Sequence, residues 1–148
     1  MIDSLILKNR SYRRFNESSR ITVDQLLKLV DLARLSPSSR NQQALKFMLI
    51  HKEEDCYNLF KELAWAGYLK DWKGPVEGER PAAYIIILGD TELGKQFDTD
   101  VGIAAQSILI GAVALGFGGC MIGSIKKEQV KETFSIGDSL PIQLVIAL

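Results

Sequence analysis

The sequence predicts an α+β fold with about four strands and five helices. Its 148 residues suit one domain of ordinary size. Hydrophobic residues make up 47% and charged residues 24%, so composition excludes the disordered, collagenous and coiled-coil classes. Segments with a helical period and segments with strand-like apolar patterns both occur along the chain.

The first half of the chain predicts three helices and a strand. A short helix lies near residues 3–8. Thr22 and Gln25 form a capping-box pattern, and apolar residues follow at helical spacing until Pro37 stops the helix. Residues 46–51 alternate like a strand, and the amphipathic segment 53–66 predicts a further helix.

The second half begins with a long loop over residues 65–81, rich in aromatic residues, glycine and proline. The continuously apolar segment 83–88 predicts a strand buried on both faces. Asp98 or Thr99 is expected to cap a long helix that ends at Gly116. A strand near 119–123, a helix over 126–134 and a strand over 141–148 complete the order.

Residues 101–123 carry no charge and exceed the ~18 residues of a candidate membrane span. Gln106 and Ser107 interrupt the stretch, and its glycines would break a spanning helix, so a buried helix followed by a strand is favoured. A helix that is apolar all round must be covered on all sides. A homodimer in which this helix packs against its twin would cover it; the alternative is cover by the chain's own helices.

Net charge and cysteine content limit the kinds of ligand and the cellular compartment that the sequence predicts. The 18 basic and 18 acidic residues cancel, which excludes broad nucleic-acid binding. Cys56, Cys120 and the single His51 have no metal-ligand spacing, so no metal site is predicted. The apolar N-terminal stretch is broken by Lys8, which argues against a signal peptide. We therefore expect a reduced, cytoplasmic protein without a membrane segment.

Three stretches carry binding chemistry. NRSYRRF, residues 9–15, gathers arginines around Ser11, as suits a phosphate, although a solvated basic turn is the alternative. LARLSPSSRNQQ, residues 32–43, offers amides and hydroxyls for a heterocycle or sugar, or forms a plain polar turn. The glycines of ALGFGGCMIGS, residues 114–124, admit a flat ligand close to the backbone, or serve a helix-to-strand turn.

In their order and spacing, these three stretches resemble the nitroreductase family of flavoproteins over nearly the whole chain, 9–148. The resemblance implies a single nitroreductase-like domain over 1–148 with a central, mostly antiparallel sheet flanked by helices. It also implies FMN as cofactor and a homodimer with flavin sites at the subunit interface.

The resemblance assigns roles residue by residue. Arg10 and Ser11 match positions that hold the FMN phosphate, and Arg13 matches one that reaches the ribityl chain and pyrimidine edge. Gln43 matches an amide that serves the partner subunit's site. The remaining matches are the ring-contacting turn and the pair whose backbone N–H groups face flavin N5 and O4: Pro37, Ser38, Ser39, Asn41, Gly123 and Ser124.

The sequence departs from the family pattern in several places. Asn9 stands where many relatives carry a further arginine, Arg40 replaces a small residue, and Ala44 with Leu45 replaces a Pro-Trp pair. The family's C-terminal tail is expected to be absent beyond Leu148, with weaker FMN binding and an incomplete dimer as the implied consequence.

The resemblance implies an FMN-dependent oxidoreductase that passes hydride from NAD(P)H through flavin N5 to a small aromatic or nitro/quinone-type acceptor. No catalytic side chain is expected, because the flavin carries the chemistry. Trp65, Tyr68 and Trp72 could stack on such an acceptor or close a small satellite core. The alternatives are a non-catalytic flavin- or nucleotide-binding module, a branch specialised in reductive dehalogenation or flavin-consuming chemistry, and a dimeric scaffold.

Overall fold

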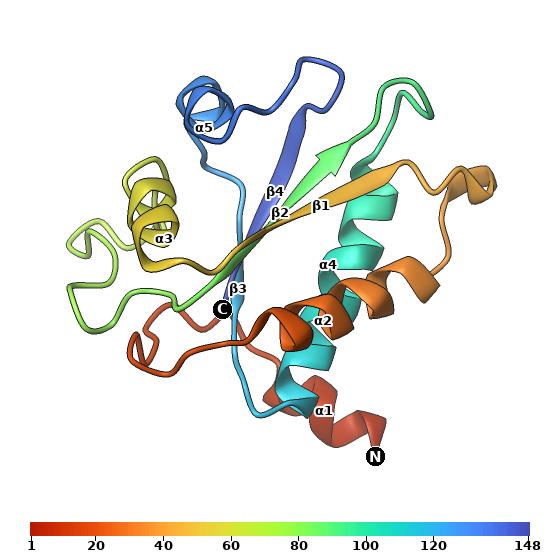
Figure 1. Cartoon of the computed structure of the whole chain (residues 1–148). Helices are drawn as coiled ribbons and strands as arrows, with labels where there is room; N and C mark the ends of the chain where they lie inside the picture. Colours follow the sequence, from red (N-terminus) through yellow and green to blue (C-terminus); the bar gives the residue numbers. More distant parts are fainter.

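A computed structural model describes the whole chain, Met1–Leu148. It contains one sheet of four strands in the order β1-β2-β4-β3, and each pair of neighbouring strands is antiparallel (Figure 1). The predicted α+β fold is confirmed. In chain order the elements are α1 (Ile2–Lys8), α2 (Val23–Leu35), the 3-10 turn η1 (Ser39–Asn41), β1 (Leu45–Ile50), α3 (Glu53–Phe60), β2 (Tyr84–Gly89), α4 (Asp98–Ala114), β3 (Cys120–Ile122), α5 (Lys127–Phe134) and β4 (Ile142–Ala147).

Helices cover both faces of the sheet. Ile85 and Ile87 of β2 belong to the apolar cluster shared with α2 and α4, whereas Tyr84 and Ile86 belong to the cluster shared with α3 and α5. Every residue of β2 is buried. The alternation of side chains across a strand therefore explains why this segment is apolar at every position, as the sequence predicts.

Helix α2 begins and ends where local chemistry places its boundaries. The side chains of Thr22 and Gln25 each accept a hydrogen bond from the other's backbone N–H, so the capping box is present. Leu26 and Leu29 are fully buried against the core. The helix stops at Leu35, two residues before Pro37, because the residue preceding a proline disfavours helical geometry.

The predicted cap of α4 was wrong. Asp98 and Thr99 lie inside the first turn, and the N-cap is Phe97, which provides no side-chain hydrogen bond. Phe97 is buried in the core, so packing decides where the helix begins. Asp98 and Asp100 instead place acidic groups in the positive first turn of the helix dipole. The predicted end is confirmed, since Gly116 takes a left-handed φ of +86°.

Helix α3 is shorter than the predicted segment 53–66. It ends at Phe60, and Leu63 then forms an isolated antiparallel bridge with Ile125. Trp65 packs into the apolar cluster on the α3 and α5 face of the sheet. The helical pattern continues in the sequence beyond Phe60, but tertiary contacts with the segment after β3 override this local helix propensity.

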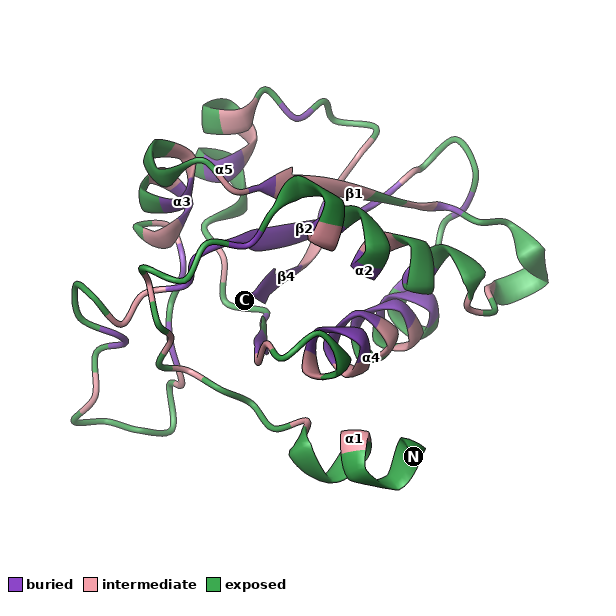
Figure 2. Ribbon diagram, turned by 60° about the horizontal axis from the view of Figure 1, so that its bottom comes forward, coloured by how far each residue is buried: buried purple, intermediate pink, exposed green.

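The apolar stretch 101–123 divides into α4 and β3, as predicted, and no helix in the structure combines the length and apolarity that crossing a membrane requires. The chain's own elements cover α4 on most sides: α2, α1 and β4 all contact it. Gly102 and Gln106 stay exposed, and α1 itself has no buried residue (Figure 2). The cover that one chain provides for this end of the molecule is thus incomplete.

Candidate functional site

The arginine segment lies against the start of β3. Ser11 forms a parallel bridge with Gly119, and the backbone N–H of Tyr12 donates to the Gly119 carbonyl at 3.0 Å. A Cβ on Gly118 would come 2.5 Å from the Tyr12 ring, and one on Gly119 would come 2.5 Å from the Ala147 carbonyl. These two glycines therefore serve the close approach of neighbouring protein segments rather than of a ligand.

The three arginines differ in what they contact. Arg14 pairs with Glu79 at 3.6 Å. Arg10 donates to the backbone carbonyls of Asn9 and Ile6, and Arg13 donates to the carbonyl of Ser11 at 3.2 Å. Neither Arg10 nor Arg13 forms an ion pair with a carboxylate, so two guanidinium groups next to a serine hydroxyl have no compensating negative charge. This donor set suits an anion such as a phosphate.

Arg13 also joins the cluster to the loop 65–81. Its guanidinium lies over the ring of Tyr68, 5.5 Å from the centroid, in cation–π range. A hollow of about 540 Å³ lies here, lined by Ser11, Tyr12, Arg13, Arg14, Leu69 and Trp72. Burial raises the pKa of the neighbouring Cys120 to about 11, and the charge of Arg13 opposes that rise. A ligand at Arg13 would therefore lie beside this loop.

The aromatic residues of the loop have separate functions. Trp65 is buried and packs against Phe15, Phe60 and Trp72, with ring centroids 5.8–6.5 Å apart. Tyr68, in contrast, is 69% exposed. Trp65 and Trp72 thus form the satellite core that was one of the two alternatives, and Tyr68 is the aromatic side chain that is free to stack on a ligand.

Gly123 and Ser124 directly follow β3, whose preceding residue Gly119 contacts the arginine segment. Both are exposed, and a Cβ on Gly123 would meet no atom within 4 Å. The carbonyl of Ser124 accepts from the backbone N–H of Ala64 at 3.0 Å, which fixes the path of the chain after the strand. The space over Gly123 is open to a ligand.

The second predicted stretch contains a tight turn, residues 37–43, that packs against the first turn of α4. Arg40, Asn41 and Gln43 have left-handed φ values of 54°, 52° and 52°, which residues other than glycine rarely adopt. The backbone N–H of Gln43 donates to the Ser38 hydroxyl at 3.1 Å. Pro37, Ser38 and Gln43 line a cavity of about 280 Å³.

Asp100 is a residue of this region that the sequence analysis did not assign. It is 4% exposed, and its Oδ1 accepts the backbone N–H of Ser39 at 2.9 Å. The available signal was an acidic residue at the edge of an apolar stretch. Its spacing was no help, because acidic residues are common in any first helical turn.

The two predicted groups of residues lie at opposite ends of α4 (Figure 1). The turn at Ser39 contacts its first turn, while Ser11 pairs with Gly119 beyond the end of the helix and Asn9 reaches Gln106 within it. The helix has 17 residues and is therefore roughly 25 Å long. One chain brings Arg10, Ser11 and Arg13 to the strand that leads to Gly123 and Ser124, but it does not bring the turn 37–43 to them.

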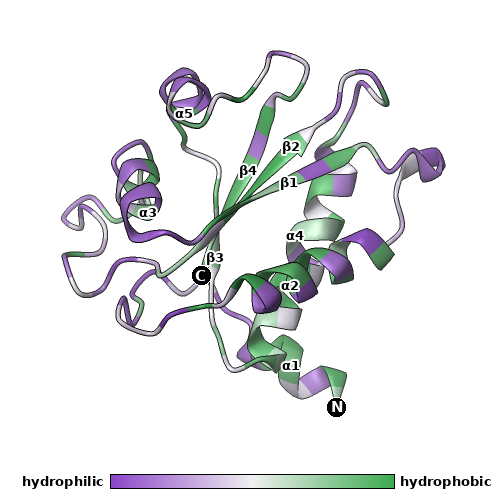
Figure 3. Ribbon diagram, in the orientation of Figure 1, coloured by the Kyte–Doolittle hydropathy of each residue, from purple (hydrophilic) through white to green (hydrophobic).

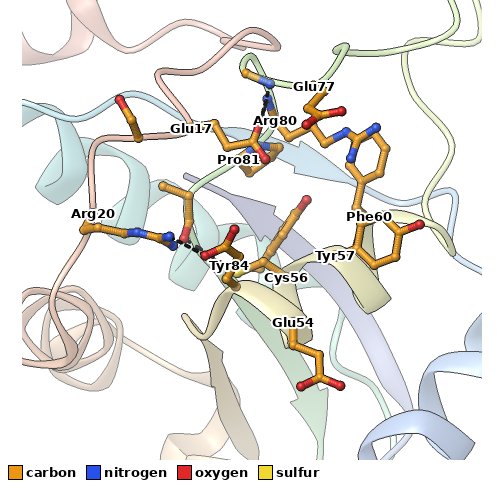
Figure 4. Close-up of a pocket in the computed structure, with 14 residues that line it drawn as sticks. Glu17, Arg20, Glu54, Cys56, Tyr57, Phe60, Glu77, Arg80, Pro81 and Tyr84 are labelled. Carbon is orange, nitrogen blue, oxygen red and sulfur yellow. Dashed lines mark hydrogen bonds and ion pairs between the residues drawn. The ribbon is translucent and has the colours of Figure 1, made fainter.

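A separate cavity of about 820 Å³ opens on the α3 side of the sheet and contains none of the predicted residues (Figure 4). Arg20 pairs with Glu53 at 2.7 Å, and Glu17 accepts from the backbone N–H groups of Gly78 and Arg80, whereas the Arg80 Nε and the Tyr84 hydroxyl have no hydrogen-bond partner. The Arg80 guanidinium packs on the Phe60 ring, 4.6 Å from its centroid. Four glutamates and two arginines line this cavity, so it does not suit an anion, and the arginine cluster is the candidate anion site.

Fold and site together define an α+β protein with an uncompensated basic cluster beside the strand that follows its long apolar helix. The sequence matches the nitroreductase family over residues 6–148, and the chain belongs to that family. The resemblance stated from the three stretches is confirmed.

Individual relatives agree with this assignment. The chain is 28% identical to YodC of Bacillus subtilis strain 168, a protein named for a proposed NAD(P)H nitroreductase activity, over 95% of this chain and 85% of that one. A nitroreductase family protein of Clostridium novyi NT superposes with a TM-score of 0.81 at 23% identity, covering 99% of this chain and 83% of its own.

A third relative was solved in complex with FMN: a nitroreductase-type protein of Exiguobacterium sibiricum 255-15, with a TM-score of 0.79 and 19% identity over 99% of this chain and 86% of that one. At these identities the two solved structures establish the fold. The family and the named homologue support an oxidoreductase.

Proposed function

We propose that the protein is an FMN-dependent oxidoreductase that transfers hydride from NAD(P)H to a small aromatic or nitro/quinone-type acceptor. The observation that carries the proposal is the pair Arg10 and Arg13, two guanidinium groups beside Ser11 without a carboxylate partner. In a chain of zero net charge, such a local excess suits one bound phosphate.

The relatives support the choice of cofactor and donor. The name of YodC refers to NAD(P)H, and the Exiguobacterium protein holds FMN. FMN, when bound, would supply the hydride-carrying atom N5, so that the protein's own contribution is binding, orientation and exclusion of water.

The chain's residues divide this work. Arg10 and Ser11 would hold the phosphate. Arg13 is half-buried, so its electrostatic interaction with a nearby charge is stronger than that of an exposed arginine. It would stabilise negative charge on the reduced ring. Gly123 would present its backbone N–H to the ring across the open space beside it. Tyr68 would contribute a stacking surface for the acceptor.

We further propose that two copies of the chain complete the site. The turn 37–43 contacts the first turn of α4, whereas Ser11 pairs with Gly119 beyond the end of the helix, so one chain holds the two groups apart. A second copy would supply the turn.

Exposed apolar residues support this dimer. Ile2, Ile6 and Leu7 of α1 are 55%, 47% and 67% exposed, and Leu27, Leu32 and Leu35 of α2 are exposed as well (Figure 3). Both helices pack against α4, and exposed apolar side chains are candidates for burial in a protein interface. A reduced cytoplasmic setting belongs to the same proposal, since Cys56 and Cys120 are free, buried thiols.

The test is a visible absorption spectrum of the protein after incubation with FMN and removal of the excess. NADPH and then NADH are added to this protein under anaerobic conditions. A yellow protein that either donor bleaches supports the proposal. A yellow protein that neither donor bleaches would indicate a flavin-binding module without turnover, and a colourless one would refute the cofactor assignment.

A further inference from the structure

The turn 37–43 and the residue before it, Ser36, are attached to α4 by two hydrogen bonds on one face of the helix. The Ser39 backbone N–H donates to Asp100 at 2.9 Å, and the hydroxyls of Ser36 and Ser107 are hydrogen-bonded at 2.7 Å. Asp100 and Ser107 are two helical turns apart and therefore point to the same side of α4. We propose that Asp100 is a positioning residue that fixes this turn for flavin binding. The inference rests on the proposed function for the identity of the ligand.

The turn needs such an attachment because its backbone is strained. Arg40, Asn41 and Gln43 all have left-handed φ values, and none is a glycine. Conformations of this kind persist only where surrounding contacts over-determine them, and they concentrate at binding sites. The same turn carries the amides of Asn41 and Gln43, whose side chains are exposed. The strained turn therefore carries polar side chains that are exposed at the surface.

The carboxylate of Asp100 interacts with the turn and has no ion-pair partner. The two cationic residues that line its cavity have other partners: Arg34 pairs with Asp31 at 2.7 Å and Lys46 with Asp90 at 3.8 Å. The carboxylate thus has the Ser39 N–H as its hydrogen-bond donor. At 4% exposed, it is shielded from water, which strengthens this bond.

Asp98 provides a matched control. It lies in the same first turn of α4 and carries the same charge toward the helix dipole, but it is exposed, and the hydrogen bond to the turn is made by Asp100. Asp98→Ala removes the dipole interaction alone. Asp100→Ala removes the dipole interaction and the attachment, and Asp100→Asn keeps an acceptor oxygen without the charge.

The experiment compares the affinities of FMN and riboflavin for the full-length wild type and these three variants, together with their urea unfolding. Asp100→Ala is expected to weaken both ligands by the same factor, about 10-fold or more, because ring contacts are common to both and the phosphate is held elsewhere. The ratio of the two dissociation constants should stay at its wild-type value. Asp100→Asn should recover most of the loss, and Asp98→Ala should stay within about twofold of wild type.

Hydrogen exchange adds a readout that does not depend on the ligand. Amides of residues 38–43 should exchange faster in Asp100→Ala, while the amides of β2 should not change. If Asp100→Ala binds both flavins as Asp98→Ala does, the inference is wrong although the proposed function holds. If the wild type binds neither flavin, the proposed function fails, and the positioning role in flavin binding fails with it.

Discussion

At the scale of single residues, identical side chains within five positions have different roles because their contacts differ. Arg14 pairs with Glu79, whereas Arg10 and Arg13 donate hydrogen bonds only to backbone carbonyls and Arg13 also lies over the Tyr68 ring. Backbone carbonyls carry a partial charge, so they leave most of a guanidinium charge available to an anion. The positive cluster in this neutral chain is accordingly two arginines rather than three.

Arg10→Ala should therefore weaken FMN binding by about 10- to 100-fold, the usual loss for a charge-assisted hydrogen bond to phosphate. Quenching of flavin fluorescence measures the dissociation constant. Arg14→Ala is the control, and its affinity should stay within about twofold of wild type, because Arg14 already has an ion-pair partner on the surface. Equal losses in the two variants would contradict the division of roles.

The buried thiols predict a pH dependence of stability. Burial raises the pKa of Cys56 and of Cys120 from 9.0 to about 11. Because the pKa is higher in the folded state, this contribution to stability is complete below pH 9 and is lost as the pH rises toward 11. The Tm should fall across this window, and it should fall less in Cys56→Ala/Cys120→Ala. An identical slope in both proteins would show that other groups cause the change.

At the scale of elements, the loop 65–81 is held from within. Trp65 packs against three other aromatic rings, and Gly74 allows the backbone to pass its indole: a Cβ there would lie 2.8 Å from the ring. The left-handed φ of +107° at Gly74 imposes the same requirement. The loop is thus an anchored segment that presents Tyr68 toward Arg13.

Trp65→Ala should lower the free energy of unfolding by about 3–5 kcal/mol, since it empties the centre of this aromatic cluster.

Tyr68→Ala should change the free energy of unfolding by less than about 0.5 kcal/mol, because the side chain is exposed, yet raise the KM for an aromatic acceptor. Urea unfolding and steady-state kinetics measure the two effects. An unchanged KM in Tyr68→Ala would remove this residue from the acceptor site.

At the scale of the whole molecule, the decisive feature is the length of α4. Its two ends hold the two halves of the predicted site, and its 17 residues keep them apart. In the proposed dimer, the exposed apolar residues of α1 and α2 would form the surface through which a second chain supplies the turn 37–43.

Mixed dimers test this arrangement. Arg10→Ala/Arg13→Ala chains and Asn41→Ala/Gln43→Ala chains should each form homodimers that bind FMN weakly. A hybrid of the two should bind one FMN at wild-type affinity, because both lesions fall in one site and the other site is intact. If each site were built from a single chain, neither site of the hybrid would be intact and the tight binding would be absent. Titration of tagged, co-purified hybrids distinguishes the two outcomes.

The sequence by itself determined the features that depend on near neighbours. The capping box of Thr22 and Gln25, the turn at Gly116 and the all-apolar β2 follow from hydrogen bonds within three residues, a backbone angle and side-chain alternation. The three motifs also identified the family, since their order along the chain is a property of sequence alone.

Only the tertiary structure decided the features that join distant residues. Packing of Phe97 shifted the start of α4, the bridge from Leu63 to Ile125 ended α3 early, and the contact between Ser39 and Asp100 spans 61 positions. No local pattern encodes such contacts, because their energy depends on which surfaces the fold brings together. For the same reason, the sequence predicts candidate site residues, and only the structure shows that one chain holds them in two separate places.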